Sequence, residues 1–499
     1  MMRRVAAAAL AFSFILTCAR PALAHGFGPT YDIPIPLWLY LYGAAAAVVL
    51  SFLPLALFSR KERYFPYRYP RFDLFRIPSL RKVLTSRLLT GGLRLLSVAL
   101  FLVVVSAGLV GLQSGFNFAP TFVWVIWWVG LSLFTAFVGN LWPLVNPWRV
   151  VFDWAEGLVR RLGYRDGLDE PYPEALGIWP AVGLYLVFVW IENVFSGSYV
   201  PRNIALFALV YSLITLYGMA FFGKETWLRR GDAFSVFFGL LGRFAPTEVR
   251  VKDPDFCGSD GCCDDAGGGC VNCYECFARA APNERELNLR PPAVGLGLPE
   301  KVTPGRAAFV IVVLAGVTFD GLLETPLWLE IVRVTPVTQT LGTILLPLLF
   351  FGIYLGFVEL SRILGGGREG DFWQSAAAYA FSLVPIAIAY QVAHYYTYLL
   401  VQGQMIVSLV SDPLGWGWNL FGTADFEPRY GIVGAGFVWY SQVALIVAGH
   451  VIAVYLAHSI SLRLLRNPGR ALSSQLPMLV LMVLYTMTSL WILAQPIVE

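Results

Sequence analysis

The chain has only four histidines, and His25 is the most informative of them because of what precedes it. It follows Ala22-Leu23-Ala24, a small-x-small motif typical of a signal-peptide cleavage site. Cleavage there would leave His25 as the first residue. Its α-amine and imidazole could then chelate copper, or serve zinc, because the amine loses its proton readily to a metal. The alternative is that His25 follows the cleavage site by chance.

Other ionisable residues lie near the ends of apolar segments. Glu192 occurs in WIENVF, Asp320 and Glu324 occur in TFDGLLETP, and His394 occurs in QVAHYYTY. At a rise of 1.5 Å per helical residue, His394 is expected about 8 Å below the outer membrane surface. Ionisable groups at such depth face the bundle interior or a water-filled cavity, which makes them functional candidates.

Four of these residues are expected at one depth on one side of the membrane. Two imidazoles and two carboxylates, from His25, His394, Asp320 and Glu192, would suit copper or zinc with a position left open for water. Asp320 and Glu192 are the predicted catalytic residues, and Glu324 is a secondary candidate. Alternatively, the carboxyls only pair with polar groups at the helix ends.

Two further histidines lie in one apolar segment. His450 is expected in its inner half, where a neutral imidazole needs a hydrogen-bond partner, so relay, supporting and purely structural roles all remain open. Glu359 is its nearest acidic neighbour by depth. His458 is expected at the cytoplasmic end, in contact with solvent.

Apart from Cys18, every cysteine falls in one segment, with the spacing C-x4-CC-x6-C-x2-C-x2-C. In a reducing cytoplasm this spacing favours thiolate ligation of zinc or an iron–sulfur cluster over disulfides, with thiols that bind no metal as the alternative. The candidate thiolate ligands are Cys257, Cys262, Cys263, Cys270, Cys273 and Cys276.

The composition determines the kind of element that must position these residues. Of 499 residues, 57% are hydrophobic and 14% are charged, and the mean hydropathy is +0.64. Repeated apolar runs of about 20 residues exclude a soluble multidomain enzyme and predict an all-α, polytopic transmembrane helix bundle. No patch suited to nucleic acid is present. The ten runs are near residues 37–58, 95–115, 120–140, 178–197, 203–222, 307–325, 338–361, 375–400, 432–456 and 474–495.

The distribution of positive charge predicts the orientation. Between the runs, 30 lysines and arginines fall on one side and only Arg202, Arg333 and Arg429 on the other. By the positive-inside rule the richer side is cytoplasmic, so both termini are outside; without the long third cytoplasmic loop the ratio is still 19 to 3. This arrangement predicts a multi-pass protein of the bacterial inner membrane, with the lipid bilayer as its partner.

Four segments are therefore expected. Residues 1–24 form a cleaved signal peptide, 25–222 contain transmembrane helices one to five, and 307–499 contain helices six to ten. Residues 223–306 form a cytoplasmic loop with the cysteines and an amphipathic helix, Trp227–Phe244, expected beside the inner leaflet. Aromatic pairs such as Trp127-Trp128 are expected to anchor the helices at the membrane border.

The sequence resembles a bacterial membrane family labelled fenitrothion hydrolase. The stretches that carry the resemblance are AHGFGPTYDIPIPLWLYLYGAAAAVVLSF, GNLWPLVNPWRVVFDW, ETWLRRGDAFSVFFGLLGRFAP, GVTFDGLLETPLW, SDPLGWGWNLFGTADF and LPMLVLMVLYTMTSLWILAQP. The resemblance runs over most of the mature chain and implies a polytopic inner-membrane hydrolase of organophosphate triesters that acts on an apolar small molecule with a related membrane subunit. It supplies no catalytic motif.

Two classes of function remain open on the sequence. In the first, a metal at the outer residues activates water for attack on a triester that partitions into the bilayer. In the second, the chain is a copper or zinc transporter or assembly protein without hydrolase activity. The four histidines would then form a ladder across the membrane, with the thiols as the inner acceptor.

Overall fold

The computed structural model describes residues 33–58, 69–163, 170–252, 270–298, 303–332, 334–366, 371–465 and 467–495. The predicted signal peptide and His25 lie outside the described residues. Within the described chain, ten helical segments are long and apolar enough to cross a membrane, and the strands form one small sheet. The predicted all-α, polytopic helix bundle is confirmed, and the protein is a multi-pass membrane protein.

Each predicted apolar run falls on one span. The first five spans are α2 (Leu37–Phe58); α3 and α4 (Pro78–Leu84, Arg87–Val110); α5, η2 and α6 (Phe118–Pro120, Thr121–Gly130, Leu131–Phe137); η3 and α9 (Glu174–Leu176, Trp179–Asn193); and α10 (Pro201–Phe222). The other five are α14 (Pro304–Leu323); α16 (Pro336–Leu364); the run of α17, η7, α18, η8 and α19 (Phe372–Ala380, Phe381–Leu383, Val384–Gln402, Gly403–Met405, Ile406–Leu409); α20 (Ala435–Leu464); and α21 (Pro468–Ala494).

Proline and capping side chains determine where many of these helices begin. Proline occupies the first helical position of α10, α14, α16 and α21, where its missing N–H costs no hydrogen bond. Thr335 and Thr338 form a reciprocal capping box before α16, and Asn467 accepts backbone hydrogen bonds at the start of α21. The third span differs, because Thr121–Gly130 is a π-helix, a geometry frequent at functional sites.

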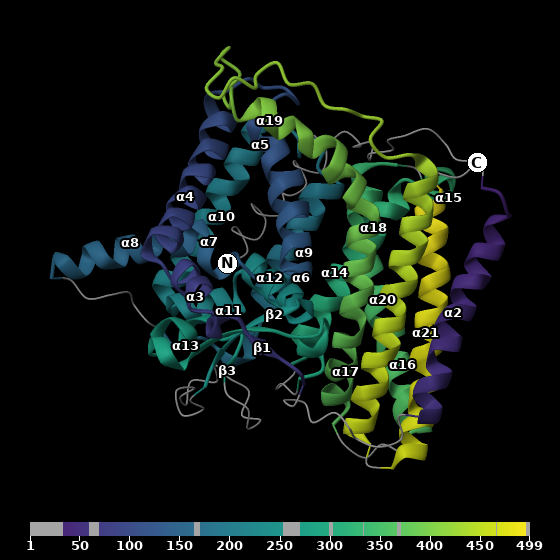
Figure 1. Cartoon of the computed structure of the whole chain (residues 1–499). Coiled ribbons are helices and arrows are strands. Elements are labelled where there is room, and N and C mark those ends of the chain that lie inside the picture. The colour runs from purple at the N-terminus through teal and green to yellow at the C-terminus, as the bar shows by residue number, and fades with distance from the viewer. Residues whose placement is uncertain are drawn as a thin grey trace, which may run out of the picture.

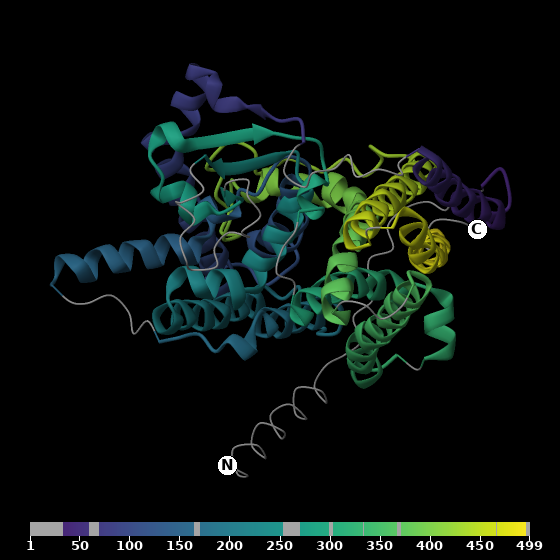
Figure 2. The ribbon, with the colours of Figure 1, turned by 90° about the horizontal axis from the view of Figure 1, so that it is seen from below.

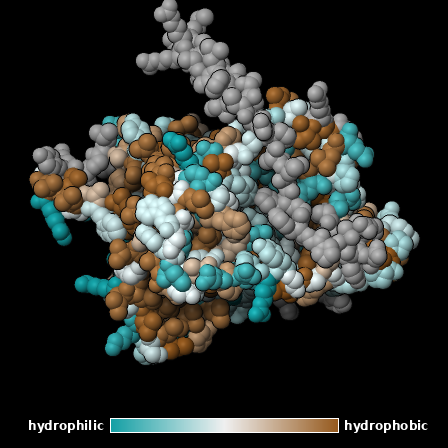
Figure 3. Space-filling model, turned by 90° about the horizontal axis from the view of Figure 1, so that it is seen from above, coloured by the Kyte–Doolittle hydropathy of each residue, from teal (hydrophilic) through white to brown (hydrophobic). Residues whose placement is uncertain are grey.

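The outward faces of the spans are apolar. On α16 the exposed leucines include Leu341, Leu345, Leu348 and Leu349, and α10 exposes Leu206, Val210 and Leu213. Figure 1 shows α10 in one half of the bundle and α16 in the other. When the molecule is viewed from above, much of its margin is hydrophobic, with some hydrophilic residues in between (Figure 3). A belt of this kind suits contact with lipid tails.

The two ends of the described chain lie on one side of the bundle. Ile33 to Leu37, at the start of α2, line a hollow together with Ala494 and Gln495, at the end of α21. This placement agrees with an even number of spans, and the charge distribution predicts that this side faces outward.

A small sheet covers the opposite end of the N-terminal half (Figure 2). Its antiparallel strands are β1 (Phe72–Asp73), β4 (Arg285–Leu289), β2 (Thr247–Val251) and β3 (Cys270–Val271), in that order. Glu248 pairs with Asn288 in the β2–β4 register and Phe72 pairs with Leu289 in the β1–β4 register. The shorter elements are η1 (Leu74–Arg76), α7 (Trp142–Val145), α8 (Pro147–Arg161), α13 (Tyr274–Arg279), η5 (Pro282–Glu284), η6 (Val294–Leu296) and α15 (Pro326–Ile331).

A buried ion cluster attaches this sheet to the helices. The Glu248 carboxylate lies 2.7 Å from Arg290 Nη1 and 3.3 Å from Arg250 Nη2, and it accepts a hydrogen bond from the Tyr69 hydroxyl. Arg290 also donates to the carbonyls of Ala245 and of two residues at the end of the helix α12 (Ala233–Phe244). Burial, and next the Glu248 charge, raise the pKa of Tyr69, so this phenol stays neutral and keeps donating.

The segment expected as one surface helix differs from that expectation. It forms α11 (Lys224–Arg230) and α12 (Ala233–Phe244), separated at Asp232, which caps α12 by accepting from the Ser235 N–H. Eight of the twelve residues of α12 are buried, because its phenylalanines occupy more than one helical face and pack against α6 and α9. This helix therefore lies inside the protein rather than on the membrane surface.

Candidate functional site

Three helices bring three of the predicted site residues together near their outer ends. Glu192 is the second-to-last residue of α9, Asp320 is one turn before the end of α14, and His394 lies in the outer half of α18. Helix α14 packs against both α9 and α18. The side chains of Asp320 and His394 are 15% and 13% exposed.

A chain of hydrogen bonds joins these groups, and we call Trp128, Glu192, Asp320, His394 and Tyr395 the outer cluster. His394 Nε2 lies 2.8 Å from Asp320 Oδ2, and the Tyr395 hydroxyl lies 2.5 Å from that same oxygen. The Tyr395 hydroxyl is also 3.3 Å from Glu192 Oε1, which accepts a hydrogen bond of 2.9 Å from Trp128 Nε1.

This arrangement suits acid–base chemistry. A carboxylate that accepts a hydrogen bond from one imidazole nitrogen determines the tautomer of the ring and leaves the other nitrogen for proton transfer or for a metal. Among the described residues none hydrogen-bonds to His394 Nδ1. The single proton of the Tyr395 hydroxyl is shared between two neighbouring carboxyls, which links Glu192 to the Asp320–His394 pair.

More polar groups surround the outer cluster. Glu324 interacts electrostatically with His394 and follows Asp320 by one helical turn. The ring of Tyr390 lies 6.1 Å from that of His394 and is fully buried, and its hydroxyl has no hydrogen-bond partner among the described residues. Tyr199 and Tyr398 form a hydrogen-bonded pair that interacts with both Glu192 and Asp320.

His25 lies outside the described residues, but the chain length permits it to reach the outer cluster. Ile33 lies beside the end of α21, and Ile492 on that helix is next to Gly321, where a Cβ atom would stand 2.8 Å from its side chain. Ile33 follows His25 by eight positions, and an extended chain of that length spans up to about 26 Å. The predicted sharing of a metal by His25 and Asp320 stays a prediction.

Among the described residues, the outer cluster does not hold a full set of metal ligands. Within the described chain, no three histidine, cysteine, aspartate or glutamate side chains are placed to hold a metal ion together. Asp320 and His394 form a pair, and Glu192 reaches them only through Tyr395. The predicted site therefore needs His25 as a ligand, and the predicted metal roles of all four residues stay predictions.

The hydrogen bonds also bear on the structural alternative for the carboxyls. In that alternative, Asp320 and Glu192 only pair with polar groups at the helix ends. The hydrogen bonds from Tyr395 to Asp320 and from Trp128 to Glu192 agree with it. It does not account for the placement of His394 against Asp320, which puts two ionisable groups in contact at membrane depth.

The two histidines of α20 lie away from the outer cluster. His450 is fully buried, with Nδ1 2.8 Å from the Ile446 carbonyl and with Nε2 without a partner among the described residues. The expectation of a solvated His458 is wrong: this side chain is 4% exposed, and its Nδ1 lies 2.8 Å from Gln475 Oε1. Glu359 is not the partner of His450, because it forms an ion pair with Arg362 at 2.9 Å.

Two cysteines of the thiolate cluster are placed by the structure. Cys273 and Cys276 are buried at the start of α13, with their Sγ atoms 2.8 Å apart and the Cys276 N–H donating to Cys273 Sγ at 3.3 Å. Cys270 lies in β3, but its side chain is outside the description, as are Cys257, Cys262 and Cys263. The predicted zinc or iron–sulfur site therefore stays a prediction.

Three members of this region were not anticipated as site residues. Trp128 was expected to anchor the helix, but it is buried and donates to Glu192. Tyr395 directly follows His394, so QVAHYYTY already contained the phenol that links the two carboxyls. Tyr390, one helical turn before His394, was also missed, although the 3.6-residue period places it on the same face.

Comparisons with models of protein families, with curated proteins and with solved structures give no match to this chain.

Proposed function

We propose that this membrane protein hydrolyses apolar phosphotriesters at the outer cluster, with copper or zinc held by His25, His394, Asp320 and Glu192. The observation that carries the proposal is the convergence of Glu192, Asp320 and His394 from three helices at one membrane depth. The substrate class comes from the resemblance to the fenitrothion hydrolase family, which also implies a related membrane subunit.

Each residue has a distinct task in this proposal. A divalent metal, when bound, would supply an activated water and polarise the phosphoryl oxygen. Asp320 holds the imidazole of His394 in one orientation through Nε2, and Tyr395 keeps Glu192 close to that pair. An aryl leaving group needs little help from an acid, so the residues mainly have to position water against phosphorus.

The position of the outer cluster fits an apolar substrate. Trp128 and the tyrosine pair Tyr199 and Tyr398 provide aromatic surface around the carboxyls. A triester that dissolves in the outer leaflet would meet such a site at its highest local concentration, because apolar molecules partition into the bilayer.

Release of a nitrophenol from a dialkyl nitrophenyl phosphotriester tests the proposal in proteoliposomes. We expect Asp320→Asn and Glu192→Gln to reduce kcat/KM at least about a hundredfold, as loss of a positioned catalytic group commonly does. Glu330→Gln is the matched control, since Glu330 is an exposed carboxyl on α15, on the same side, and it should leave turnover unchanged. Equal turnover in all four proteins would contradict the proposal.

A second candidate is transport of a metal ion or a proton, and buried polar groups along the C-terminal helices favour it. Tyr485 hydrogen-bonds to Thr318 on α14, and its ring lies 6.0 Å from that of His450. Tyr485 also interacts electrostatically with Tyr390, which stands beside His394. The imidazole of His450 and the phenol of Tyr390 are fully buried, and neither His450 Nε2 nor the Tyr390 hydroxyl has a hydrogen-bond partner among the described residues. Burying an unsatisfied polar group costs free energy, so such groups within membrane spans are functional candidates.

His450→Leu separates the two candidates. A hydrolase needs only the outer cluster, so this variant should keep its triester turnover. A transporter should lose metal or proton flux into liposomes, because the substitution interrupts the polar groups below the outer cluster. Unchanged flux together with turnover lost in the outer-cluster variants would exclude transport as the function of these groups.

A further inference from the structure

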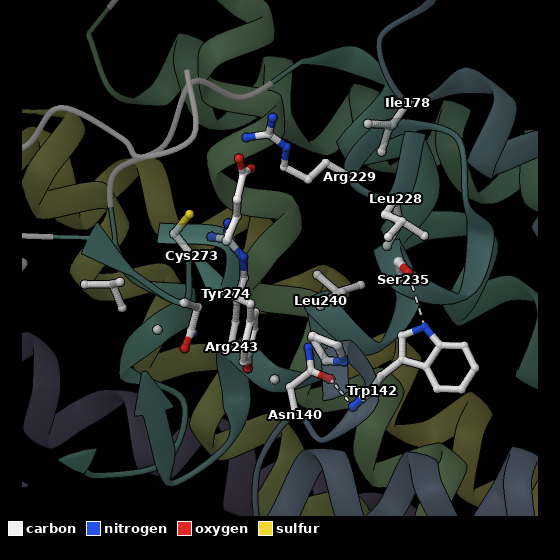
Figure 4. Close-up of a pocket in the computed structure, with 18 of the residues that line it drawn as sticks. Asn140, Trp142, Ile178, Leu228, Arg229, Ser235, Leu240, Arg243, Cys273 and Tyr274 are labelled. Carbon is white, nitrogen blue, oxygen red and sulfur yellow. Dashed lines mark hydrogen bonds between the residues drawn. The ribbon is translucent and has the colours of Figure 1, made fainter. Parts of the chain in front are cut away.

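A cavity of about 310 Å³ lies at the predicted cytoplasmic end of the N-terminal half, far from the outer cluster along the helices. In Figure 4, Arg229 and Leu228 border it on one side, Asn140 and Trp142 on another, and Cys273 and Tyr274 on a third. These side chains come from α11, from the start of α7 and the loop before it, and from the start of α13. Its volume is near the lower end of ordinary ligand sites, about 300–1,000 Å³.

The lining carries more positive than negative charge. Among the described residues, four arginines contribute to it, Arg149, Arg229, Arg243 and Arg306, against the two carboxylates of Glu225 and Glu275. Both carboxylates have cationic partners: Glu225 forms a two-point ion pair with Arg149, and Glu275 pairs with Arg279, which does not line the cavity. The excess positive charge favours an anionic ligand.

Neutral hydrogen-bonding groups supplement the arginines. The amides of Asn140, Asn146 and Asn272 and the hydroxyl of Ser235 all line the cavity. Burial raises the pKa of Tyr274 above its ordinary value, so its phenol stays neutral and can donate a hydrogen bond. Planar guanidinium groups combined with amide and hydroxyl donors are the usual means of holding a phosphate.

The backbone leaves room for a ligand at the centre of α12. A Cβ atom added at Gly239 would meet nothing within 4 Å, although this helix is otherwise closely packed and Gly239 lines the cavity. A Cβ atom at Gly239 can therefore be added without displacing a neighbour, and a longer side chain there would occupy part of the cavity.

We propose that this cavity binds the phosphate group of an anionic ligand, held by Arg229, Arg243 and Arg306 beneath α12. The phosphate belongs either to a phospholipid head group of the inner leaflet or to a soluble phosphate ester of the cytoplasm. This proposal does not rest on the hydrolase function, because it uses none of the outer-cluster residues.

Binding is measured on the full-length protein in nanodiscs made of phosphatidylcholine. One arm adds phosphatidylglycerol to the nanodisc lipid, and the other adds glycerol phosphate to the buffer, and the thermal midpoint is followed in each. The variants are Gly239→Leu, which fills the cavity and keeps every charge, and Arg243→Gln, which removes one guanidinium. Arg87→Gln is the matched control, because Arg87 is an exposed arginine at the start of α4, outside the cavity.

We expect a saturable rise in the thermal midpoint of the wild type with at least one of the two phosphates. Arg243→Gln should raise the half-saturating concentration about tenfold, the usual effect of losing a hydrogen bond to a charged group, while Arg87→Gln should match the wild type. A rise with phosphatidylglycerol alone assigns the site to lipid, and a rise with glycerol phosphate alone assigns it to a soluble ester. The proposal is overturned if neither phosphate gives a saturable rise, or if Gly239→Leu responds as the wild type does.

Discussion

At the residue scale, the sequence already contained the ionisable members of the outer cluster. Glu192, Asp320 and His394 stand out because charge is rare in apolar runs, and the helical rise placed them at one depth. It could not show that Tyr395 and Trp128 would link them. Depth follows from position along a helix, whereas contact depends on which way each helix is rotated, and almost uniformly apolar spans carry little information about rotation.

Burial of polar residues was also hard to anticipate from sequence. His458 was expected in solvent because it comes near the end of an apolar run, but α20 continues to Leu464 and α21 supplies Gln475 as its partner. The ion cluster around Glu248 was not foreseen, because it joins residues from the segment before α3 and from both sides of the cysteine-rich loop.

Removing the Glu248 carboxylate should destabilise the protein strongly. Glu248→Ala would leave Arg250 and Arg290 buried without their anionic partner, and breaking a buried pair in this way costs about 3–5 kcal/mol. Reversible unfolding in mixed micelles measures the loss in the free energy of unfolding. Glu174→Ala, at an exposed carboxyl in η3, serves as control and should change it by less than about 0.5 kcal/mol. A similar small effect of Glu248→Ala would contradict the structural role given to this cluster.

At the element scale, the positions of the spans were predictable and their packing was not. The length of the apolar runs was enough to locate all ten spans. The packing differed from expectation, because the residues expected in a surface helix include the buried helix α12. Hydrophobicity alone does not distinguish a helix that contacts lipid from one that contacts protein, because both environments are apolar. The π-helix Thr121–Gly130 likewise has no apolar signature of its own, although it carries Trp128 to the outer cluster.

The contact between α18 and α20 gives an element-scale prediction. A Cβ atom at Gly449 would stand 2.8 Å from the Pro385 carbonyl oxygen and even closer to the Cβ atom of Ala389. Gly449→Val should therefore separate these helices and cost about 1–3 kcal/mol in the free energy of unfolding, as overpacking usually does.

The matched control for this substitution is Gly43→Val. Gly43 lies on α2, where an added Cβ atom meets nothing within 4 Å, so the unfolding free energy of this variant should stay close to that of the wild type. Equal stability of the two variants would show that α18 and α20 are not as closely packed as described.

At the whole-molecule scale, composition predicted the class of protein, and the distribution of charge predicts its orientation. The ten spans agree with the composition, and the two ends of the described chain meet at one side of the bundle, as an even number of spans requires. The charge excess predicts that this side faces outward and that the small sheet and the cysteines face the cytoplasm.

Reporter fusions test this orientation. A phosphatase that folds only outside the cytoplasm should be active when fused after Glu499, and a fluorescent protein that folds only inside should be active when inserted into the segment 253–269. The same two reporters exchanged between the sites should both be inactive. If the reporters are active only in the exchanged fusions, the predicted orientation is wrong and the outer cluster faces the cytoplasm.

The metal content of the purified mature chain tests the central claim most directly. Mass spectrometry should find an equivalent of copper or zinc in protein with a verified His25 amino terminus. That equivalent should be lost in His25→Ala and in Asp320→Asn, and retained in Glu330→Gln and in a variant with all six loop cysteines changed to serine. Metal that disappears only with the cysteines, or an outer-cluster variant that keeps its full metal content, would contradict the assignment of the metal to the outer cluster.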